Sequence, residues 1–320
     1  MIELDLDKEK QYVVAFSGGA DSALLAYLLK QQCFKFRLVH IVHPDSKASK
    51  DGKAIADFCC EWAKKYEVDI KVVEIVTNSV SVKKHGTESA ERDARYKALF
   101  GELKSDEILL TGHHLDDSIE TFFFRLARGT SVKGLSGIQK NSEISPRLMR
   151  PLLSIPKSEI QLSVESAAIL YGHDSLNDST ELSRGFIRNK IIPLFVEHFS
   201  PSKFYASLRR AMENFSECSA LLEDLANMDT QICGTNEAGI CRVNFANLSD
   251  ARQRNFIYQL VAKETRLYLS RNAIEEIRKR VKSNNKRMEF TVSGVTVIID
   301  NHFFSLQKNE KDVNMEWMQK

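Results

Sequence analysis

Six consecutive residues near the N-terminus, Ser17-Gly18-Gly19-Ala20-Asp21-Ser22, combine the backbone freedom and the polar groups that a phosphate site requires. They follow the apolar residues 12–16 and precede an apolar-periodic stretch from residue 23, an order that predicts a strand, a tight glycine turn and a helix. Two glycines let the backbone approach a ligand closely, and the N–H groups of the turn and of the helix N-terminus attract an anion. Asp21 would repel phosphate unless a divalent cation lay between the two. Carboxylate and phosphate oxygens are hard ligands, and they indicate Mg²⁺.

The same six residues also fit a plain turn between a strand and a helix, with Asp or Ser as the helix cap. They are not a Walker A motif, because no Gly-Lys-Ser/Thr follows the glycines. Residues 129–136 have the glycine spacing of that motif, but Leu135 stands where lysine is required, and we expect a mobile loop there. The serine-glycine-glycine loop is instead similar to that of the PP-loop ATP pyrophosphatases, which cleave ATP between the α and β phosphates.

Histidines and carboxylates gather in the segment Thr111-Gly112-His113-His114-Leu115-Asp116-Asp117, which follows a short predicted strand and opens a helix. At the carboxyl end of a strand, these side chains suit general acid–base or metal chemistry. The alternative is a helix cap by Asp116 beside solvated histidines. Because the His-x-x-x-His spacing of a zinc helix is missing, no transition-metal site is predicted.

Three basic segments each have a functional and a purely structural interpretation. In Glu88-x-x-x-Arg92-x-x-Arg95-Tyr96, Arg95 suits a phosphate clamp, whereas Glu88 and Arg92 suit a surface ion pair. A second segment fits either an oxyanion or RNA contact, or a solvated basic turn. It is Arg184-Gly185-Phe186-Ile187-Arg188-Asn189-Lys190. A third is a phosphate-contacting patch or a solvated helix face: Arg278, Lys279, Arg280, Lys282, Lys286 and Arg287.

Alternating strand and helix signals position these segments. Strands are expected at 12–16, 37–42, 70–76 and 107–110, and helices at 22–31, 50–66, 88–103, 117–127 and 157–171. This alternation predicts an α/β fold, a doubly wound parallel sheet whose carboxyl-terminal strand ends carry Ser17, His43 and Thr111. We expect a catalytic domain at 1–200 and a smaller, mainly helical second domain at 201–320. The second domain should contain helices at 204–228, 250–263 and 271–283, a β-hairpin at 288–292 and 295–299, and a strand at 303–307.

Composition narrows the class of protein. The 320 residues are 43% hydrophobic and 28% charged, which is ordinary for a soluble globular protein. No apolar run reaches the length of a membrane span, the first ten residues do not resemble a signal peptide, and we expect a cytoplasmic protein. Six cysteines without a Cys-x-x-Cys pair fit free thiols better than zinc or disulfides. A net charge of +2 confines any RNA surface to a local patch.

Taken together, the motifs resemble the tRNA(Ile)-lysidine synthetases, a bacterial family of PP-loop enzymes, over nearly the whole chain. The resemblance rests on residues 17–22, 88–96 and 114–121, and it continues through 128–137, 150–153, Asp174 with Asn177, and 184–193. Residues 243–307 match the family's small second domain more loosely, and we expect the shorter form, without the last domain of longer members. Three positions depart from the pattern: His43-Pro44-Asp45 replaces part of a His-His-Gly run, Glu91 an Ala, and Gly185 an Asn.

The resemblance implies a two-step reaction at the wobble cytidine of an isoleucine tRNA with a CAU anticodon. ATP adenylates the carbon-2 oxygen and releases pyrophosphate, and the side-chain amine of L-lysine then attacks carbon 2 and displaces AMP to leave lysidine. The implied cofactors are ATP and Mg²⁺, the implied partners are the tRNA and lysine, and a homodimer is left open.

The chemistry of individual residues agrees with this reaction. Residues 17–22 would hold the leaving pyrophosphate, and Asp21 and Asp117 would carry Mg²⁺ or orient the amine. A carboxylate or His114 would take the proton of the amine. Arg95 and Arg188 would stabilise charge developing on the phosphate and the cytosine oxygen. The residues expected to contact tRNA are Arg184, Arg278, Lys279 and Lys282.

Three other functions compete with this one. A tRNA thiolase also adenylates a base, but it would need catalytic cysteines, commonly in Cys-x-x-Cys pairs. A nonenzymatic RNA-binding protein would not need the intact phosphate loop and paired aspartates. A small-molecule synthetase or amidotransferase would turn over without RNA.

Overall fold

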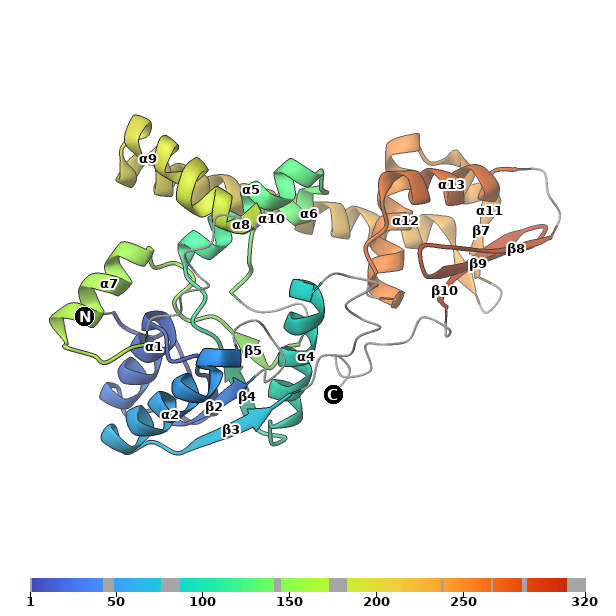
Figure 1. The fold of residues 1–320 in the computed structure, drawn as a ribbon. Helices are drawn as coiled ribbons and strands as arrows, with labels where there is room; N and C mark the ends of the chain where they lie inside the picture. Colours follow the sequence, from blue (N-terminus) through green and yellow to red (C-terminus); the bar gives the residue numbers. More distant parts are fainter. Residues whose placement is uncertain are drawn as a thin grey trace. The chain divides into compact units, whose positions relative to one another are not determined.

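A computed structural model describes residues 2–42, 49–75, 87–140, 145–172, 183–236, 239–265, 267–283 and 287–309 (Figure 1). The sequence features at His43, Pro44, Asp45, Asp174 and Asn177 lie outside these residues. The chain divides into two compact units, the first running to Glu213 and the second beginning at Asn214, and each is described by itself. The division falls within one long helix, α10 (Pro201–Cys233), and the domain boundary expected at 200/201 stays a prediction.

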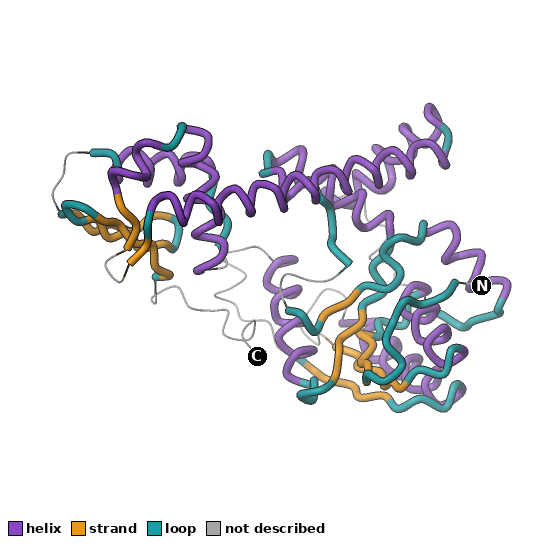
Figure 2. Tube along the Cα trace, turned by 180° about the vertical axis from the view of Figure 1, so that it is seen from behind, coloured by secondary structure: helices purple, strands orange, loops and turns teal. Residues whose placement is uncertain are grey.

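The first unit is built on a five-stranded parallel sheet in the order β3-β2-β1-β4-β5. Its strands are β1 (Gln11–Ala15), β2 (Lys35–Val42), β3 (Ile70–Glu74), β4 (Glu107–Leu110) and β5 (Leu148–Met149). The connecting helices are α1 (Ala20–Gln31), α2 (Ser49–Lys65), α4 (Thr87–Gly101), α5 (Leu115–Arg128), α6 (Val132–Leu135) and α7 (Lys157–Ser166). Figure 2 shows these strands from behind, with helices on both sides of them. The α/β fold class predicted from the alternating pattern is confirmed.

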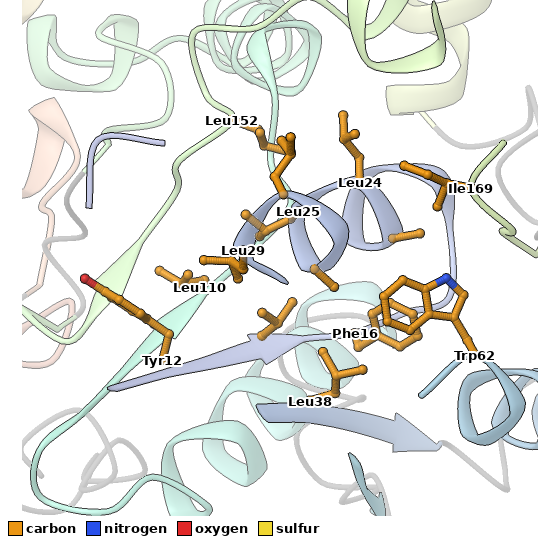
Figure 3. Packing of buried hydrophobic residues seen from close by; sticks show 14 of the residues in the cluster. Tyr12, Phe16, Leu24, Leu25, Leu29, Leu38, Trp62, Leu110, Leu152 and Ile169 are labelled. Carbon is orange, nitrogen blue, oxygen red and sulfur yellow. The ribbon is translucent and has the colours of Figure 1, made fainter. Parts of the chain in front are cut away.

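Both faces of this sheet are apolar, as buried parallel strands require. On one face, Tyr12, Phe16, Leu38 and Leu110 pack with helix residues of α1, α2 and α7, among them Trp62 (Figure 3). On the other face, strand residues 13, 39, 109 and 148 pack with α4 through positions 96, 99 and 100. Because helices cover both faces of the sheet, the strands are held in place. The loops that follow β1 and β4 therefore start from fixed positions.

Three differences from the sequence-based expectations have local causes. The strand β5 is only two residues long, too short to show a period, and residues predicted to be loop contain the single-turn helix α6. The helix predicted at 157–171 ends at Ser166, because the chain turns at Ala168 with φ 48.

The helical part of the first unit continues through α8 (Ser183–Phe186), a π-helical turn η2 (Ile187–Ile191) and α9 (Ile192–Phe199). Pro193 in the first turn of α9 has no N–H for the carbonyl four residues earlier, which accounts for the widened turn just before it.

The second unit contains α11 (Arg242–Asn247), α12 (Asp250–Thr265), α13 (Arg271–Val281) and a five-stranded sheet in the order β6-β7-β10-β9-β8. The strands are β6 (Thr235–Asn236), β7 (Gly239–Cys241), β8 (Met288–Val292), β9 (Val295–Ile299) and β10 (Phe303–Lys308), all antiparallel. The hairpin β8–β9 turns at Ser293 and Gly294, both with positive φ, as a two-residue hairpin loop requires. No helix among the described residues is long and apolar enough to cross a membrane.

Candidate active site

The loop between β1 and α1 exposes its backbone where an anion would bind. Gly18 has φ +83, and a Cβ there would lie 3.0 Å from the Cys59 sulfur, so only glycine fits without strain. Gly19 is extended and precedes α1 without a side-chain cap. The Ser22 hydroxyl instead turns inward to the Gly19 carbonyl at 3.0 Å. The first-turn N–H groups of α1 therefore face outward beside the positive end of the helix dipole, as a phosphate site requires.

A second loop, between β4 and α5, lies directly against this one. A Cβ on Gly112 would lie 3.0 Å from the Asp21 carbonyl carbon and 3.1 Å from the Ser22 nitrogen. Both neighbours are backbone atoms that cannot swing aside. Gly112 is thus required for the close approach that brings the histidines and aspartates of the second loop to the phosphate loop.

Asp21 is paired with a lysine that sequence reasoning did not select. Lys157 Nζ lies 2.5 Å from Asp21 Oδ1. Lys157 is the first residue of α7, where a positive charge opposes the helix dipole. A lysine directly after Pro156, at a helix start that prefers acids, was the signal in the sequence that could have identified it.

His114 and Asp117, at the start of α5, lie close to Asp21. The backbone N–H of His114 donates to Asp117 Oδ2 at 2.9 Å. The buried His114 ring places Nε2 3.5 Å from Asp117 Oδ2 and 3.8 Å from Asp21 Oδ1. Burial alone would raise the pKa of Asp117, but His114, His113, the His114 N–H and Arg188 hold it below its usual value. Asp117 is therefore a carboxylate at neutral pH, and the structure brings all three predicted residues together.

Asp116, the other member of the aspartate pair, faces a different set of partners. Its Oδ2 accepts the backbone N–H of Lys157 at 2.7 Å, and its Oδ1 accepts the hydroxyl of Tyr205 at 2.5 Å. Tyr205 belongs to the first turns of α10. Asp116 thus joins the starts of α7 and α10, and it holds the residue whose ammonium reaches Asp21.

Arg188 approaches the same centre through a second buried carboxylate. Its Nε and Nη2 donate to the two oxygens of Glu120 at 2.5 and 2.9 Å, and Nη2 lies 3.9 Å from Asp117 Oδ1. Burial raises the pKa of Glu120 against the opposing effect of Arg188. Glu120 lies one helical turn after Asp117. In the sequence analysis it belonged to the matched segment 114–121 but was assigned no role. The site therefore holds a guanidinium and two carboxylates side by side.

Comparison with known proteins shows the family to which this chain belongs. The sequence model of the PP-loop domain matches residues 2–195. The chain belongs to the PP-loop family. It is 33% identical over 268 residues to a tRNA(Ile)-lysidine synthase of Pseudomonas fluorescens, covering 79% of this chain and 58% of the relative. It is 35% identical over 204 residues to that of Wigglesworthia glossinidia brevipalpis, covering 59% and 50%. The chain thus spans about half the length of the curated relatives it matches.

Among solved structures, a U34-tRNA thiolase from Methanococcus maripaludis matches with a TM-score of 0.50 and 23% identity, over 66% of this chain and 74% of that one. This likeness concerns the fold alone and agrees with the parallel sheet described above.

Within this PP-loop site, His113 belongs to the segment predicted for acid–base or metal chemistry, but the sequence assigned it no role of its own. Its Nδ1 lies 2.8 Å from the Thr111 hydroxyl. Burial lowers the pKa of His113 to about 4, with smaller effects of neighbouring charges including Arg150 and Arg92. The ring is therefore neutral at physiological pH and can donate or accept a hydrogen bond, but it is a poor acceptor for a lysine proton.

Of the two arginines on α4, Arg92 influences this centre more directly than the predicted Arg95. Arg92 lies over the ring of Tyr96, with 5.1 Å between the guanidinium carbon and the ring centroid, and its charge acts on His113. Arg95 is exposed, and its charge contributes to the lowered pKa of His40, for which burial is the main cause. Its phosphate-clamping role stays a prediction.

The predicted tRNA-contacting residues divide into two groups. In the first unit, Arg184 lies over the Phe124 ring at 5.4 Å. In the second unit, Arg278 is largely buried and pairs with Asp250 at 2.6 Å and Glu275 at 2.9 Å. The remaining predicted cations on and after α13, Lys279 and Lys282, are exposed. Arg278 therefore has a structural task that the charge run did not reveal.

Proteins often hold Mg²⁺ through one or two carboxylates together with substrate phosphates and water. Asp21 and Asp117 both lie within 4 Å of the same His114 nitrogen, next to the phosphate loop. No cluster of three or more His, Cys, Asp or Glu ligands occurs among the described residues. The two carboxylates therefore fit a magnesium ion that arrives with ATP better than a metal held by protein alone.

Proposed function

We propose that this protein modifies isoleucine tRNA with a CAU anticodon by ligating L-lysine to carbon 2 of the wobble cytidine, at the expense of ATP. The observation that carries the proposal is the placement of two acidic side chains, Asp117 and Glu120, beside a PP-loop. A phosphate loop alone accounts for ATP. The adjacent Asp117 carboxylate supplies the negative charge that an incoming cationic amine needs, and the relatives named above are lysidine synthases.

In the first half-reaction, the cytidine carbon-2 oxygen forms a bond to the α-phosphorus of ATP, and the bond to the β-phosphate oxygen breaks. The leaving pyrophosphate carries the electron pair and is received by the N–H groups of residues 17–22. Lys157 pairs with Asp21 of this loop, and its ammonium can leave Asp21 to bind a phosphate oxygen instead. Asp21 would hold magnesium, which would neutralise phosphate charge when ATP is bound.

In the second half-reaction, lysine enters as an ammonium ion, because its reference pKa is about 10.4. Asp117 attracts this cation, Glu120 holds Arg188 beside it, and His114 takes one proton from the ammonium. The freed nitrogen forms its bond to carbon 2, and the carbon–oxygen bond breaks with its electron pair on AMP. Arg188, held by Glu120 beside Asp117, stabilises charge on the departing oxygen.

A reconstituted reaction tests this proposal. The protein is incubated with ATP, Mg²⁺, L-lysine and a transcript of tRNA(Ile) bearing CAU, and digested nucleosides are analysed by mass spectrometry. We expect lysidine, and pyrophosphate release that requires the tRNA. A transcript with uridine at the wobble position serves as control and should give neither. Turnover without RNA, or a thiolated nucleoside in the presence of a sulfur donor, would replace this proposal with a rival. Light scattering on the same sample reports whether the protein is a monomer or a homodimer.

A further inference from the structure

One side of α5 leads from the reaction centre to an exposed aromatic and basic surface. Asp117, Glu120, Phe124 and Arg128 follow one another at spacings of three or four residues, so they share one side of the helix. The first two are the carboxylates of the site. Phe124 is partly exposed and Arg128 is exposed. The character of this side therefore changes along the helix from acidic and buried to aromatic and cationic.

The neighbouring helical segment, α8 and η2, places two arginines against this side of α5. In Figure 1, α8 lies alongside α5, and the contacts agree. Arg188 of η2 donates a hydrogen bond to Glu120. Arg184, one turn earlier, lies over the Phe124 ring, with 5.4 Å between its guanidinium carbon and the ring centroid. Arg128 lies over the same ring at 5.1 Å. Phe124 thus anchors two guanidinium groups, and we call Phe124, Arg128 and Arg184 the arginine–phenylalanine platform.

The chemistry of this platform fits single-stranded RNA. Guanidinium groups bind phosphates, and both aromatic rings and guanidinium planes stack with nucleobases. An enzyme that modifies a base must take that base out of its stack, so the nucleotides beside it lose a neighbour and need support. Along α5, Phe124 lies about 10 Å and Arg128 about 16 Å beyond Asp117, at 1.5 Å per residue. At about 3.4 Å per stacked nucleotide, these distances correspond to roughly three to five nucleotides.

We propose that the arginine–phenylalanine platform binds the anticodon-loop nucleotides that flank the reacting cytidine. The guanidinium planes that lie over the Phe124 ring stack with bases, and the positive charges of Arg128 and Arg184 contact the phosphates between them. The identity of the RNA rests on the proposed function, whereas the platform itself rests on the contacts along α5.

The test measures the affinity of the full chain for a 17-nucleotide anticodon stem–loop of tRNA(Ile) at several salt concentrations. Phe124→Leu keeps apolar volume but removes the π face that holds both guanidinium groups in place for stacking, and a single base stack is worth about 5- to 150-fold in affinity. We expect a loss in that range. Arg128→Ala should also reduce the slope of log affinity against log salt by about 0.7. Arg128→Lys should keep that slope but bind more weakly than wild type, because lysine retains the charge and lacks the planar group.

Two matched variants serve as controls. Phe199→Leu alters another exposed aromatic residue, on α9, and Lys64→Ala removes an exposed cation from α2. Neither should change the affinity for the stem–loop. Melting temperatures check that each variant is folded, and the exposed Arg128 keeps the test decisive if Phe124→Leu is unstable.

Wild-type affinity in folded Phe124→Leu and Arg128→Ala would overturn the platform, even if the wild-type protein makes lysidine. Conversely, a wild-type protein that makes no lysidine would refute the proposed function. Weakened RNA binding by the platform variants would still support the platform in that case.

Discussion

Replacing Lys157 with methionine should separate the role of this residue in catalysis from its role in stability. The ammonium lies 2.5 Å from Asp21 Oδ1, but the two side chains are 32% and 30% exposed. A pair this open to solvent contributes about 1 kcal/mol or less to folding. For a unit of this size, about 1 kcal/mol corresponds to a shift in melting temperature of roughly 2–4 °C. Lys157→Met should therefore melt no more than about 4 °C below wild type.

The expected effect on turnover is much larger. Loss of one preorganised donor to developing negative charge typically lowers kcat by about 10²- to 10³-fold, or about 2.7–4 kcal/mol. If Lys157 contacts the phosphates during adenylation, tRNA-dependent pyrophosphate release should fall by this factor. The same assay with Lys157→Arg should recover part of the rate, since a cation is restored at the same place.

A matched lysine–aspartate pair elsewhere provides the control. Lys140 Nζ lies 2.6 Å from Asp5 Oδ2 on an exposed surface outside the site. Lys140→Met should leave pyrophosphate release unchanged. The reasoning would be refuted if Lys157→Met retained wild-type turnover. It would also be refuted if the loss of turnover disappeared once the variant was assayed well below its melting temperature, because the pair would then act only on folding.

Three further outcomes are expected. Asp117→Asn should slow the lysine-dependent step in single-turnover assays more than it slows adenylation, and equal loss of both steps would assign Asp117 to magnesium. Glu107 accepts two hydrogen bonds from Arg37 at 2.7 Å, which hold the pKa of Glu107 below its usual value. Its stabilisation is thus present above pH 4.5 and is lost as the pH falls. Glu107→Gln should cost about 1.5–3 kcal/mol at pH 7 and less at pH 3, as followed by thermal melts, and a pH-independent difference would contradict this. Lys279→Ala should lower the slope of log tRNA affinity against log salt by about 0.7–0.9, whereas Arg278→Ala should mainly lower the melting temperature. The reverse result would place Arg278 on the tRNA.

The sequence was sufficient for the parts of the fold that depend on local patterns. The glycine loop after β1 and the polar run after β4 follow short apolar strands, and both strands were predicted to within one residue. Parallel strands expose their carboxyl ends at one edge, so Asp21, His114 and Asp117 were expected at a common centre, and the structure brings them together.

Long-range pairings were not accessible in the same way. Lys157 reaches Asp21 across 136 positions of the chain, and no local pattern reports such a contact. The basic run on α13 shows a similar limit. Arg278 and Lys279 are adjacent in sequence, but helix geometry turns one toward Asp250 and Glu275 and the other to solvent. A charge run gives the number of cations, and only the packing tells which of them are already neutralised.

The paired aspartates illustrate how helix geometry assigns different tasks to identical neighbours. Successive residues of an α-helix point about 100° apart, so Asp116 and Asp117 take different hydrogen-bond partners, although the His114 ring lies within 4 Å of both. Asp117 shares its side of α5 with Glu120 and faces His114 and Arg188. Asp116 has both oxygens occupied, by the Lys157 N–H and the Tyr205 hydroxyl. One aspartate is thus available to substrates, while the other fixes the start of the helix that supplies the only lysine paired with Asp21 in the described part of the chain.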